Sequence, residues 1–289
     1  MRILLIGGTG FIGEYVTKEL ARLHHKVYVV HKSPLKAKNK FGGVRYFRTD
    51  LNLQNPQLKR IFKRVDVLVT LIQPDLRQMK NVILAARGAK ELKKIVYLST
   101  LLLYPDSASP QKETAAPKPV TQYERKKYKE ESMISRFAKK ENYPLTVLRV
   151  ATVYGDVKNK GIVNRVFLSL IRRDDLTIRG GRSNLKMRDY IFVEDAAKLI
   201  AFFILSKQKK PLEVINISTG RGYSVHDLVG RIEAITGGKA EFKTGKPISD
   251  KNINIGDNKK MKALSQYKFK HNLTTGLKKT YKNYLKIYS

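Results

Sequence analysis

The stretch GGTGFIG, Gly7 to Gly13, constrains the fold more than any other part of this sequence, because of what stands on each side of it. Before it, Ile3 to Ile6 form a continuous apolar run, which is typical of a strand buried on both faces. After it, apolar residues recur at helical spacing at Tyr15, Val16, Leu20 and Leu23. A buried strand that passes through clustered glycines into an amphipathic helix predicts the first crossover unit of a parallel α/β sheet.

The N-terminal half repeats this alternation of strand and helix. Further runs typical of buried strands are KVYVVH, VDVLVTLI, KKIVYLS and LTVLRVA. Between the last two, YERKKYKEESMISRFAKK reads as a helix whose apolar face holds Tyr128, Met133, Ile134 and Phe137. The alternation predicts an α/β fold, a doubly wound parallel sheet of the Rossmann type with helices on both faces.

The pattern loosens after Gly155, where we expect a smaller α/β C-terminal lobe. The predicted division is a first domain over residues 1–160, with 187–219 returning to it, and a lobe over 161–289. In the lobe, Ser224 is expected to cap a helix that ends at Gly237. The last helix is predicted from an apolar stripe four residues apart, at Leu273, Leu277, Tyr281 and Leu285.

The composition excludes several classes of protein. The chain has no Cys, which excludes disulfides, thiolate nucleophiles and Cys-ligated metals, and its five His residues show no metal-ligand spacing. The most apolar run, Leu199 to Leu205, is far shorter than a membrane span, and the first residues run directly into a strand. We therefore expect a cytoplasmic protein with no metal site and no membrane partner.

The charge is strongly positive, with 58 Lys and Arg against 24 Asp and Glu, a net charge of +34. Such a field favours anionic partners, including nucleic acid. The basic residues are spread along the chain without a basic arm or an RNA-binding motif, which argues against a specific nucleic-acid site. A Lys-rich solvated surface is the alternative interpretation.

The glycines of the opening stretch fit two spacings at once, Gly7-x-x-Gly10-x-x-Gly13 and Gly8-x-Gly10-x-x-Gly13. Glycine allows the tight turn and the close approach of backbone to a pyrophosphate, and the helix N-terminus offers N–H groups and a partial positive charge. An ordinary strand-to-helix turn needs only one glycine. The spacing therefore favours a dinucleotide-binding loop.

The ends of the second and third strands bear on which dinucleotide binds. An acid at the end of the second strand indicates NAD, whereas basic residues accommodate the 2′-phosphate of NADP. Here that strand ends in His31 and Lys32, followed by Lys36 and Lys38, so we expect NADP in preference to NAD. Asp50 follows the third strand and is a candidate acceptor for the adenine amino group, with a helix N-cap as the alternative.

A tyrosine and a lysine four residues apart indicate acid–base chemistry. Tyr123 and Lys127 share one face of the predicted helix, where an ammonium can stabilise a phenolate. Thr100 ends the strand IVYLST, at the edge of the sheet where open α/β proteins bind ligands. Each also has an ordinary alternative, a chance pair among many Lys and Tyr residues and a hydroxyl that caps a turn.

Five motifs together resemble the extended short-chain dehydrogenase/reductases, and among them the NAD-dependent epimerase/dehydratase family, in its nucleotide-sugar epimerase-like group. They are GGTGFIG, IVYLST with LLLYP, YERKKYKEE, LRVATVYG and MRDYIFVEDAA, and the resemblance extends over nearly the whole chain. It implies an NAD(P)-binding Rossmann domain followed by a smaller substrate-binding lobe. It also implies an enzyme that acts on a nucleotide-activated sugar through a Tyr-Lys pair and hydride exchange with nicotinamide.

The resemblance further implies a role for each matching residue. Tyr123 would be the catalytic acid/base, Lys127 would bond the nicotinamide ribose and tune Tyr123, and Thr100 would hydrogen-bond the reacting oxygen. Arg188 would bind the diphosphate of the substrate, since a guanidinium can bind two oxygens. The cofactor-binding residues would be Gly7, Gly10, Phe11, Ile12 and Gly13 at the pyrophosphate, His31 and Lys32 at the adenosine ribose, and Asp50 and Leu51 at the adenine.

The sequence also departs from the family pattern. His31 replaces the acid usual in NAD-dependent members, and Leu101 to Leu103 replace the Asp-Glu pair of the 4,6-dehydratases. An epimerase and a keto-sugar reductase both stay open. Two non-catalytic alternatives are an RNA-binding relative and an NADP-sensing relative of the same fold. A homodimer is expected from the resemblance alone.

Overall fold

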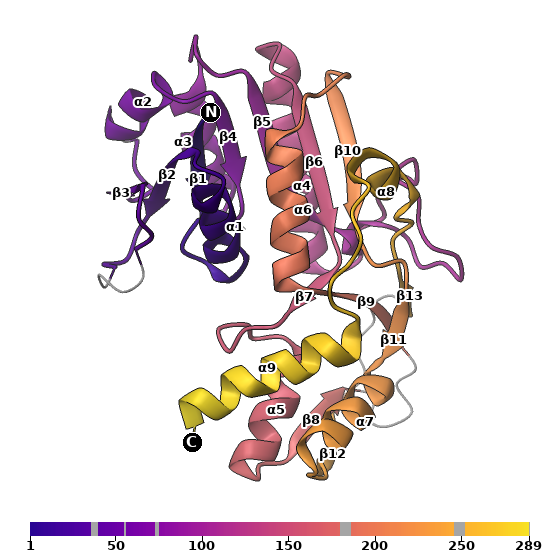
Figure 1. Ribbon diagram of the computed structural model, residues 1–289. Helices are drawn as coiled ribbons and strands as arrows, with labels where there is room; N and C mark the ends of the chain where they lie inside the picture. The colour runs from indigo at the N-terminus through magenta and orange to yellow at the C-terminus, as the bar shows by residue number, and fades with distance from the viewer. Residues whose placement is uncertain (36–39, 55, 73–74, 180–185, 246–251, 289) are drawn as a thin grey trace. The chain divides into compact units, whose positions relative to one another are not determined.

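The structure, a computed structural model, describes residues 1–35, 40–54, 56–72, 75–179, 186–245 and 252–288 (Figure 1). Its main element is a seven-stranded parallel sheet with the strand order β10-β6-β5-β4-β1-β2-β3. The strands are β1 (Arg2–Ile6), β2 (Lys26–His31), β3 (Val44–Arg48), β4 (Val67–Thr70), β5 (Lys94–Thr100), β6 (Leu145–Val150) and β10 (Leu212–Ile217). The predicted Rossmann-type sheet is confirmed. The five apolar runs from which it was predicted form β1, β2, β4, β5 and β6.

Crossover helices connect these strands and bury their apolar faces. They are α1 (Phe11–Arg22), α2 (Pro56–Phe62), α3 (Leu76–Ala86), α4 (Gln122–Lys140) and α6 (Val193–Leu205), with a short 3₁₀ helix, η2 (Leu101–Leu103), after β5. Leu58 of α2, Met79 of α3 and Ile134 of α4 pack in one core with Leu4, Leu68 and Ile95 of the sheet. Because helices cover the strands, β1 can be apolar along its length, and Ile3 to Ile6 are fully buried.

The remaining elements are the strands of smaller sheets and the helices that follow them in the chain. They are β7 (Thr152–Tyr154), α5 (Ile162–Arg172), β8 (Leu176–Arg179), β9 (Met187–Phe192), β11 (Gly222–Ser224), α7 (Val225–Thr236), β12 (Phe242–Gly245), β13 (Ile253–Asn254), α8 (Lys259–Ser265) and α9 (Leu273–Tyr288). Strand β9 pairs with β7, β11 and β13, and β12 pairs with β8. A second core joins Phe167 of α5, Leu228 of α7 and Leu277 of α9. No helix in the described residues is long and apolar enough to cross a membrane.

The chain folds into two compact units that alternate along the sequence. The first unit comprises Met1–Leu103, Gln122–Arg149 and Ala197–Ile215, and the second comprises Tyr104–Thr121, Val150–Ala196 and Asn216–Ser289. The first unit holds most of the main sheet with its crossover helices. The sequence-based division at residue 160, with 187–219 returning, stays a prediction about domains, and so does the cytoplasmic location.

The sequence-based predictions are correct for the ends of α7 and only partly correct for the buried face of α9. Ser224 caps α7 through a capping box with Asp227, and α7 ends at Gly237 with a φ of +74°, as predicted. In α9, Leu273 and Leu277 are buried, but Leu285 is 43% exposed and Tyr284 takes the core position instead. The predicted stripe at intervals of four residues drifts around a helix of 3.6 residues per turn, which is why it fails at its last member.

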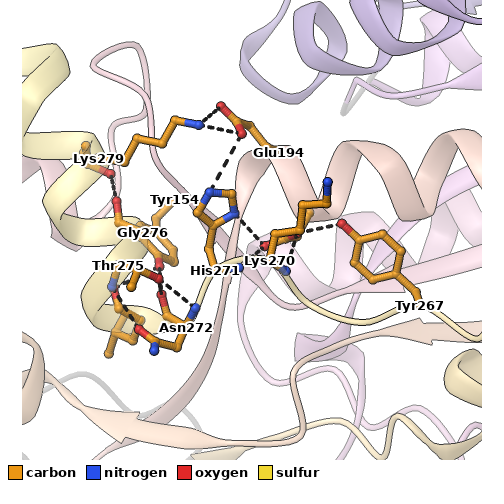
Figure 2. Close-up of polar contacts among 12 residues, drawn as sticks. Tyr154, Glu194, Tyr267, Lys270, His271, Asn272, Thr275, Gly276 and Lys279 are labelled. Atoms are coloured by element: carbon orange, nitrogen blue, oxygen red, sulfur yellow. Dashed lines mark hydrogen bonds and ion pairs between the residues drawn. The ribbon is translucent and has the colours of Figure 1, made fainter.

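The start of α9 is held by one buried carboxylate, that of Asp195 at the beginning of α6. Its oxygens accept hydrogen bonds from the Tyr267 hydroxyl at 2.6 Å and from the backbone N–H groups of Lys270 and His271 at 3.1 and 3.0 Å. The Nδ1 atom of His271 lies 3.0 Å from the same carboxylate, and Figure 2 shows His271 beside Glu194, which pairs with Lys279. A buried charge with several donors is well satisfied, so this cluster fixes α9 on its unit.

Candidate functional site

The loop between β1 and α1 has no room for side chains at two of its glycines. Gly7 has a φ of +91°, and a Cβ atom there would overlap the side chain of Ile72. A Cβ atom on Gly13 would overlap the carbonyl oxygen of Gly7, so the helix touches the turn directly. The loop is closed by a hydrogen bond from the Gly10 N–H to that same oxygen at 3.1 Å. The backbone itself therefore requires glycine at both positions.

The first turn of α1 is left without a side-chain cap. Gly10 is the N-cap, with φ −76° and ψ 177°, and it has no side chain to accept a hydrogen bond from the helix. The first helical hydrogen bond runs from the Glu14 N–H to the Gly10 oxygen at 2.9 Å. The N–H groups of Phe11, Ile12 and Gly13 precede it and begin the helix dipole. An N-terminus without a side-chain cap, behind a turn rich in glycine, fits a pyrophosphate.

The residues expected at the adenosine end contact one another. The Lys32 ammonium lies 3.1 Å from a carboxylate oxygen of Asp50. Asp50 also accepts a hydrogen bond from the Asn52 N–H at 2.9 Å, and this bond, followed by Lys32, holds the pKa of Asp50 below its ordinary value. His31 Nδ1 contacts the Ser33 oxygen at 2.8 Å, and Leu51 is buried beside Asp50. Asp50 is thus not an N-cap, since α2 begins at Pro56. Lys36 and Lys38 lie outside the described residues.

Thr100 and Tyr123 meet where β5 ends. The Thr100 side chain is 8% exposed, and its hydroxyl accepts a hydrogen bond from the Leu102 N–H at 3.2 Å, which caps η2. Desolvation raises the pKa of Tyr123 above its ordinary value, and the interaction with the Thr100 side chain partly offsets this. Tyr123 is nevertheless 42% exposed at the start of α4. The arrangement gives a protonated phenol with one face open to a ligand.

Lys127 lies one turn further along α4 and points into the core. It is only 5% exposed, and its ammonium donates to the Leu98 oxygen at 2.9 Å and to the Tyr97 hydroxyl at 3.2 Å. Among the described residues, no hydrogen bond joins this ammonium to Tyr123. The predicted pair therefore shares a helix face, while Lys127 is oriented by β5.

The buried face of α4 differs from the sequence-based prediction. Tyr128, expected in the core, is 40% exposed, whereas Glu124, Glu130 and Glu131 are buried. The acids occupy core-facing positions because each finds a polar partner there. For Glu131, the partners are the Arg149 guanidinium at 2.6 Å and the Ser99 hydroxyl at 2.5 Å.

Sequence reasoning missed this group of buried polar residues. Tyr97 and Glu130 are fully buried, and the Tyr97 hydroxyl donates to Glu130 Oε2 at 2.9 Å. Lys127 lies 3.6 Å from that oxygen. The available signal was the position of Glu130 and Glu131, three and four residues after Lys127 and so on the same face of the helix.

Arg188 lies in the second unit, on β9. Its Nη1 atom donates to the Met187 oxygen at 2.9 Å and to the Asn252 oxygen at 3.2 Å. These bonds orient the guanidinium beside β9 and β13. The expected role of Arg188 at a diphosphate stays a prediction. No group of three or more His, Cys, Asp or Glu side chains that could hold a metal ion occurs in the described part of the chain.

Known proteins resemble this chain over most of its length. The model of the NAD dependent epimerase/dehydratase family matches residues 3–218. An uncharacterized UDP-glucose epimerase of Bacillus subtilis is 25% identical and covers 96% of each chain. The UDP-glucose 4-epimerase of Thermotoga maritima, solved with UDP-glucose, is 26% identical, with a TM-score of 0.88 over 100% of each chain. That of Thermus thermophilus, solved with NAD, has a TM-score of 0.88 over 99% of each chain, and its 21% identity indicates the fold alone.

The expected preference for NADP finds no support. The Thermus thermophilus relative is a complex with NAD. In this chain, Lys32, one of the basic residues on which the expectation rested, already has a partner, because its ammonium lies 3.1 Å from the Asp50 carboxylate. A lysine with a carboxylate partner gains less from a 2′-phosphate than a free one does.

Proposed function

Because the chain belongs to the NAD dependent epimerase/dehydratase family, we propose that it is an NAD-dependent enzyme that epimerises a nucleotide-activated sugar. The observation that carries the proposal is the loop from Gly7 to Gly13, whose glycines are required by the backbone and whose helix starts without a cap. A turn built only to connect β1 with α1 has no need of an open helix N-terminus. The loop and the Thr100–Tyr123 pair lie in the same compact unit.

The dinucleotide site is proposed to use the loop and the ends of β2 and β3. The N–H groups of Phe11, Ile12 and Gly13 would bind the pyrophosphate, with Gly7 and Gly10 leaving it space. His31, Lys32, Asp50 and Leu51 would border the adenosine. We propose NAD as the cofactor, since Lys32 lies 3.1 Å from Asp50 and the adenosine end would therefore meet a carboxylate as well as an ammonium. When bound, the nicotinamide supplies reversible acceptance of a hydride from the sugar carbon.

The proton chemistry is assigned to Tyr123 and Thr100. Tyr123 in its phenolate form would take the proton from the sugar hydroxyl as the sugar carbon is oxidised. The resulting phenol would return the proton after the keto-sugar has presented its other face to the nicotinamide. The Thr100 hydroxyl would bind the same oxygen, which keeps it within reach of Tyr123. Lys127 would supply the positive charge that makes a phenolate accessible, because desolvation, together with the charges of Glu130 and Glu124, holds the pKa of Tyr123 high.

The proposed substrate is a UDP-hexose, and the proposed reaction is inversion at C4. The support is the name of the Bacillus subtilis relative and of the Thermotoga maritima enzyme, which was solved with UDP-glucose. The sequence LLL at Leu101–Leu103 supports epimerisation over dehydration, since it offers no acid or base to eliminate water. Arg188 is proposed to bind the diphosphate of this substrate.

The test is turnover of UDP-glucose by the purified protein with NAD. We expect UDP-galactose to form without net reduction or oxidation of the nicotinamide, followed by proton NMR of the anomeric signals. Tyr123→Phe is expected to lower the rate by about 100-fold or more, the usual contribution of a general acid–base group. Tyr128→Phe is the matched control, because Tyr128 lies on the same helix with its ring 40% exposed.

Two outcomes would replace the proposal. Stoichiometric consumption of reduced nicotinamide with a keto-sugar would identify a reductase. No turnover of UDP-glucose, UDP-glucuronic acid or dTDP-glucose, together with no binding of NAD, would point to a non-catalytic relative. Sedimentation at the same concentrations checks the proposed homodimer.

A further inference from the structure

Helix α4 buries an acid and a base together, at a cost that apolar residues would avoid. Glu130 is fully buried and Lys127 is 5% exposed, in a helix whose other inward positions include Ile134 and Phe137. Burying a charge is unfavourable unless it is paired and hydrogen-bonded. Within the part of the chain that the structure describes, no donor bonds the Oε1 atom of Glu130, which adds to the cost. A residue with this penalty, next to the predicted catalytic pair, calls for a functional reason.

The geometry ties Glu130 to Lys127 twice. Directly, Glu130 Oε2 lies 3.6 Å from the Lys127 ammonium. Indirectly, the Tyr97 hydroxyl accepts a hydrogen bond from Lys127 at 3.2 Å and donates one to Glu130 at 2.9 Å. The ammonium also lies 4.8 Å from the centre of the Tyr97 ring, within the range of a cation–π contact. Glu130 and Tyr97 thus bind the Lys127 ammonium together.

The electrostatics of the group show what the acid does. Desolvation lowers the pKa of Lys127, and Glu130 is the main influence that opposes this fall. The other charges that face Lys127 are Glu131, which also favours the ammonium, and Lys126, which disfavours it. Glu131 already has a permanent cation, because it is paired with Arg149. Desolvation raises the pKa of Glu130, and Lys127 is the main influence that opposes this rise, so each group of the pair favours the charged form of the other.

We propose that Glu130 is a positioning residue, which keeps Lys127 charged and oriented so that Lys127 can stabilise the Tyr123 phenolate. The inference rests on the proposed function for the role of Tyr123. The alternative is that Glu130 acts on Tyr123 itself, since its negative charge also raises the pKa of that phenol. The two roles predict opposite changes in the pKa of Tyr123 when Glu130 is removed. If Glu130 acts through Lys127, its removal makes Tyr123 harder to ionise; if it acts directly, its removal makes Tyr123 easier to ionise.

The first experiment needs no substrate. The unfolding equilibrium of the full chain is measured in urea between pH 7 and pH 9 for the wild type, Glu130→Gln and the double variant Glu130→Gln/Lys127→Met. With Glu130 gone, Lys127 is expected to be neutral in the folded state and charged in the unfolded state. The unfolding constant of Glu130→Gln should then fall with pH more steeply than that of the wild type, by up to about tenfold per pH unit for one proton. The double variant should lose the extra slope.

Two further variants keep this test decisive. Glu131→Gln is the matched control, because its own cation is Arg149, which does not titrate in this range. Stability should fall with a clearly smaller change of slope than in Glu130→Gln, since Glu131 contributes less than Glu130 to the charge of Lys127. If Glu130→Gln does not fold, Tyr97→Phe removes the bridging hydroxyl and leaves both charges, and a smaller change in the same direction is expected. Equal slopes in the wild type and Glu130→Gln overturn the proposal.

The second experiment measures turnover against pH. The acid limb of the kcat profile, in the direction in which Tyr123 accepts the proton, should move to higher pH in Glu130→Gln and move less in Glu131→Gln. A shift to lower pH, or none, overturns the positioning role. A wild-type protein that turns over no nucleotide sugar would refute the proposed function alone, and the urea experiment would still decide whether Glu130 holds the charge of Lys127.

Discussion

Replacing Gly13 by alanine tests the link between the shape of the loop and cofactor binding. The added Cβ atom would overlap the Gly7 carbonyl oxygen, a backbone atom that no side-chain rotation can move. Helix or loop must shift by about 1 Å, and misplacement of that size can cost about 100-fold in a pre-organised site. Overpacking costs roughly 1–3 kcal/mol, while alanine favours the helix by about 1 kcal/mol. We therefore expect a net loss of stability below about 2 kcal/mol and a loss of NAD affinity near 100-fold.

Isothermal titration of NAD into apo-protein and urea unfolding measure the two quantities separately. Gly10→Ala tests the space in front of the loop without straining the fold, because its Cβ atom would meet only the Gly7 oxygen at 3.4 Å, an ordinary contact. This variant should fold as the wild type does and still bind NAD weakly, since the methyl group would occupy the space of the pyrophosphate. Gly230→Ala in α7 is the control: its Cβ atom meets nothing within 4 Å, so it should gain stability and leave NAD binding unchanged.

Undiminished NAD binding by folded Gly13→Ala and Gly10→Ala would refute the reasoning. It would mean that the glycines serve only the packing of α1 against β1. A large loss of affinity in Gly230→Ala would show instead that the assay reports general damage.

Three further predictions concern stability. Asp195→Asn replaces a carboxylate that accepts hydrogen bonds from three donors, so we expect a loss of about 2–4 kcal/mol and faster amide hydrogen exchange in α9, whereas equal exchange would refute this anchor. Burial lowers the pKa of Lys94 to about 8, so the unfolded chain binds the extra proton between pH 8 and 10.5 and stability should rise with pH in that window; Lys94→Met should lose this rise in urea unfolding. Ser224→Ala removes the N-cap of α7 and should cost about 1 kcal/mol in thermal unfolding, with NAD binding as the unaffected control.

The main sheet was predictable because its strands carry their signal locally. Parallel strands covered on both faces read as continuous apolar runs, and the glycine pattern after β1 specifies a turn whose geometry does not depend on distant residues. The cap at Ser224 was predictable for the same reason, since the hydroxyl and the helix it caps are neighbours in sequence.

The face of α4 was not predictable from apolar residues, because charged residues occupy it. Glu130 and Lys127 are buried through partners on β5, and Tyr128 is exposed in their place. Those partners are some thirty residues away in the sequence, so the pairing depends on how the sheet is assembled. A pattern of hydrophobicity assigns every charge to solvent, so it missed the buried acids and misplaced Tyr128, although Ile134 and Phe137 are buried as predicted.

The preference for NADP lacks support for a related reason. A basic residue at the end of β2 gains less from a 2′-phosphate when a carboxylate already lies beside it. The register of β2 with β3 places His31 opposite Arg48, which brings the following residues, Lys32 and Asp50, within 3.1 Å. Register between strands is a property of the folded sheet, and neither residue shows it alone.

The alternation of the two compact units along the chain sets an order of events during synthesis. The last strand of the main sheet, β10, leaves the ribosome only after α5, β8 and β9 of the other unit have been made. Translation therefore delivers half of the second unit while the first still lacks its edge. A chain cut short after β10 would carry every strand of the sheet with its glycine turn, but none of α7, α8 and α9.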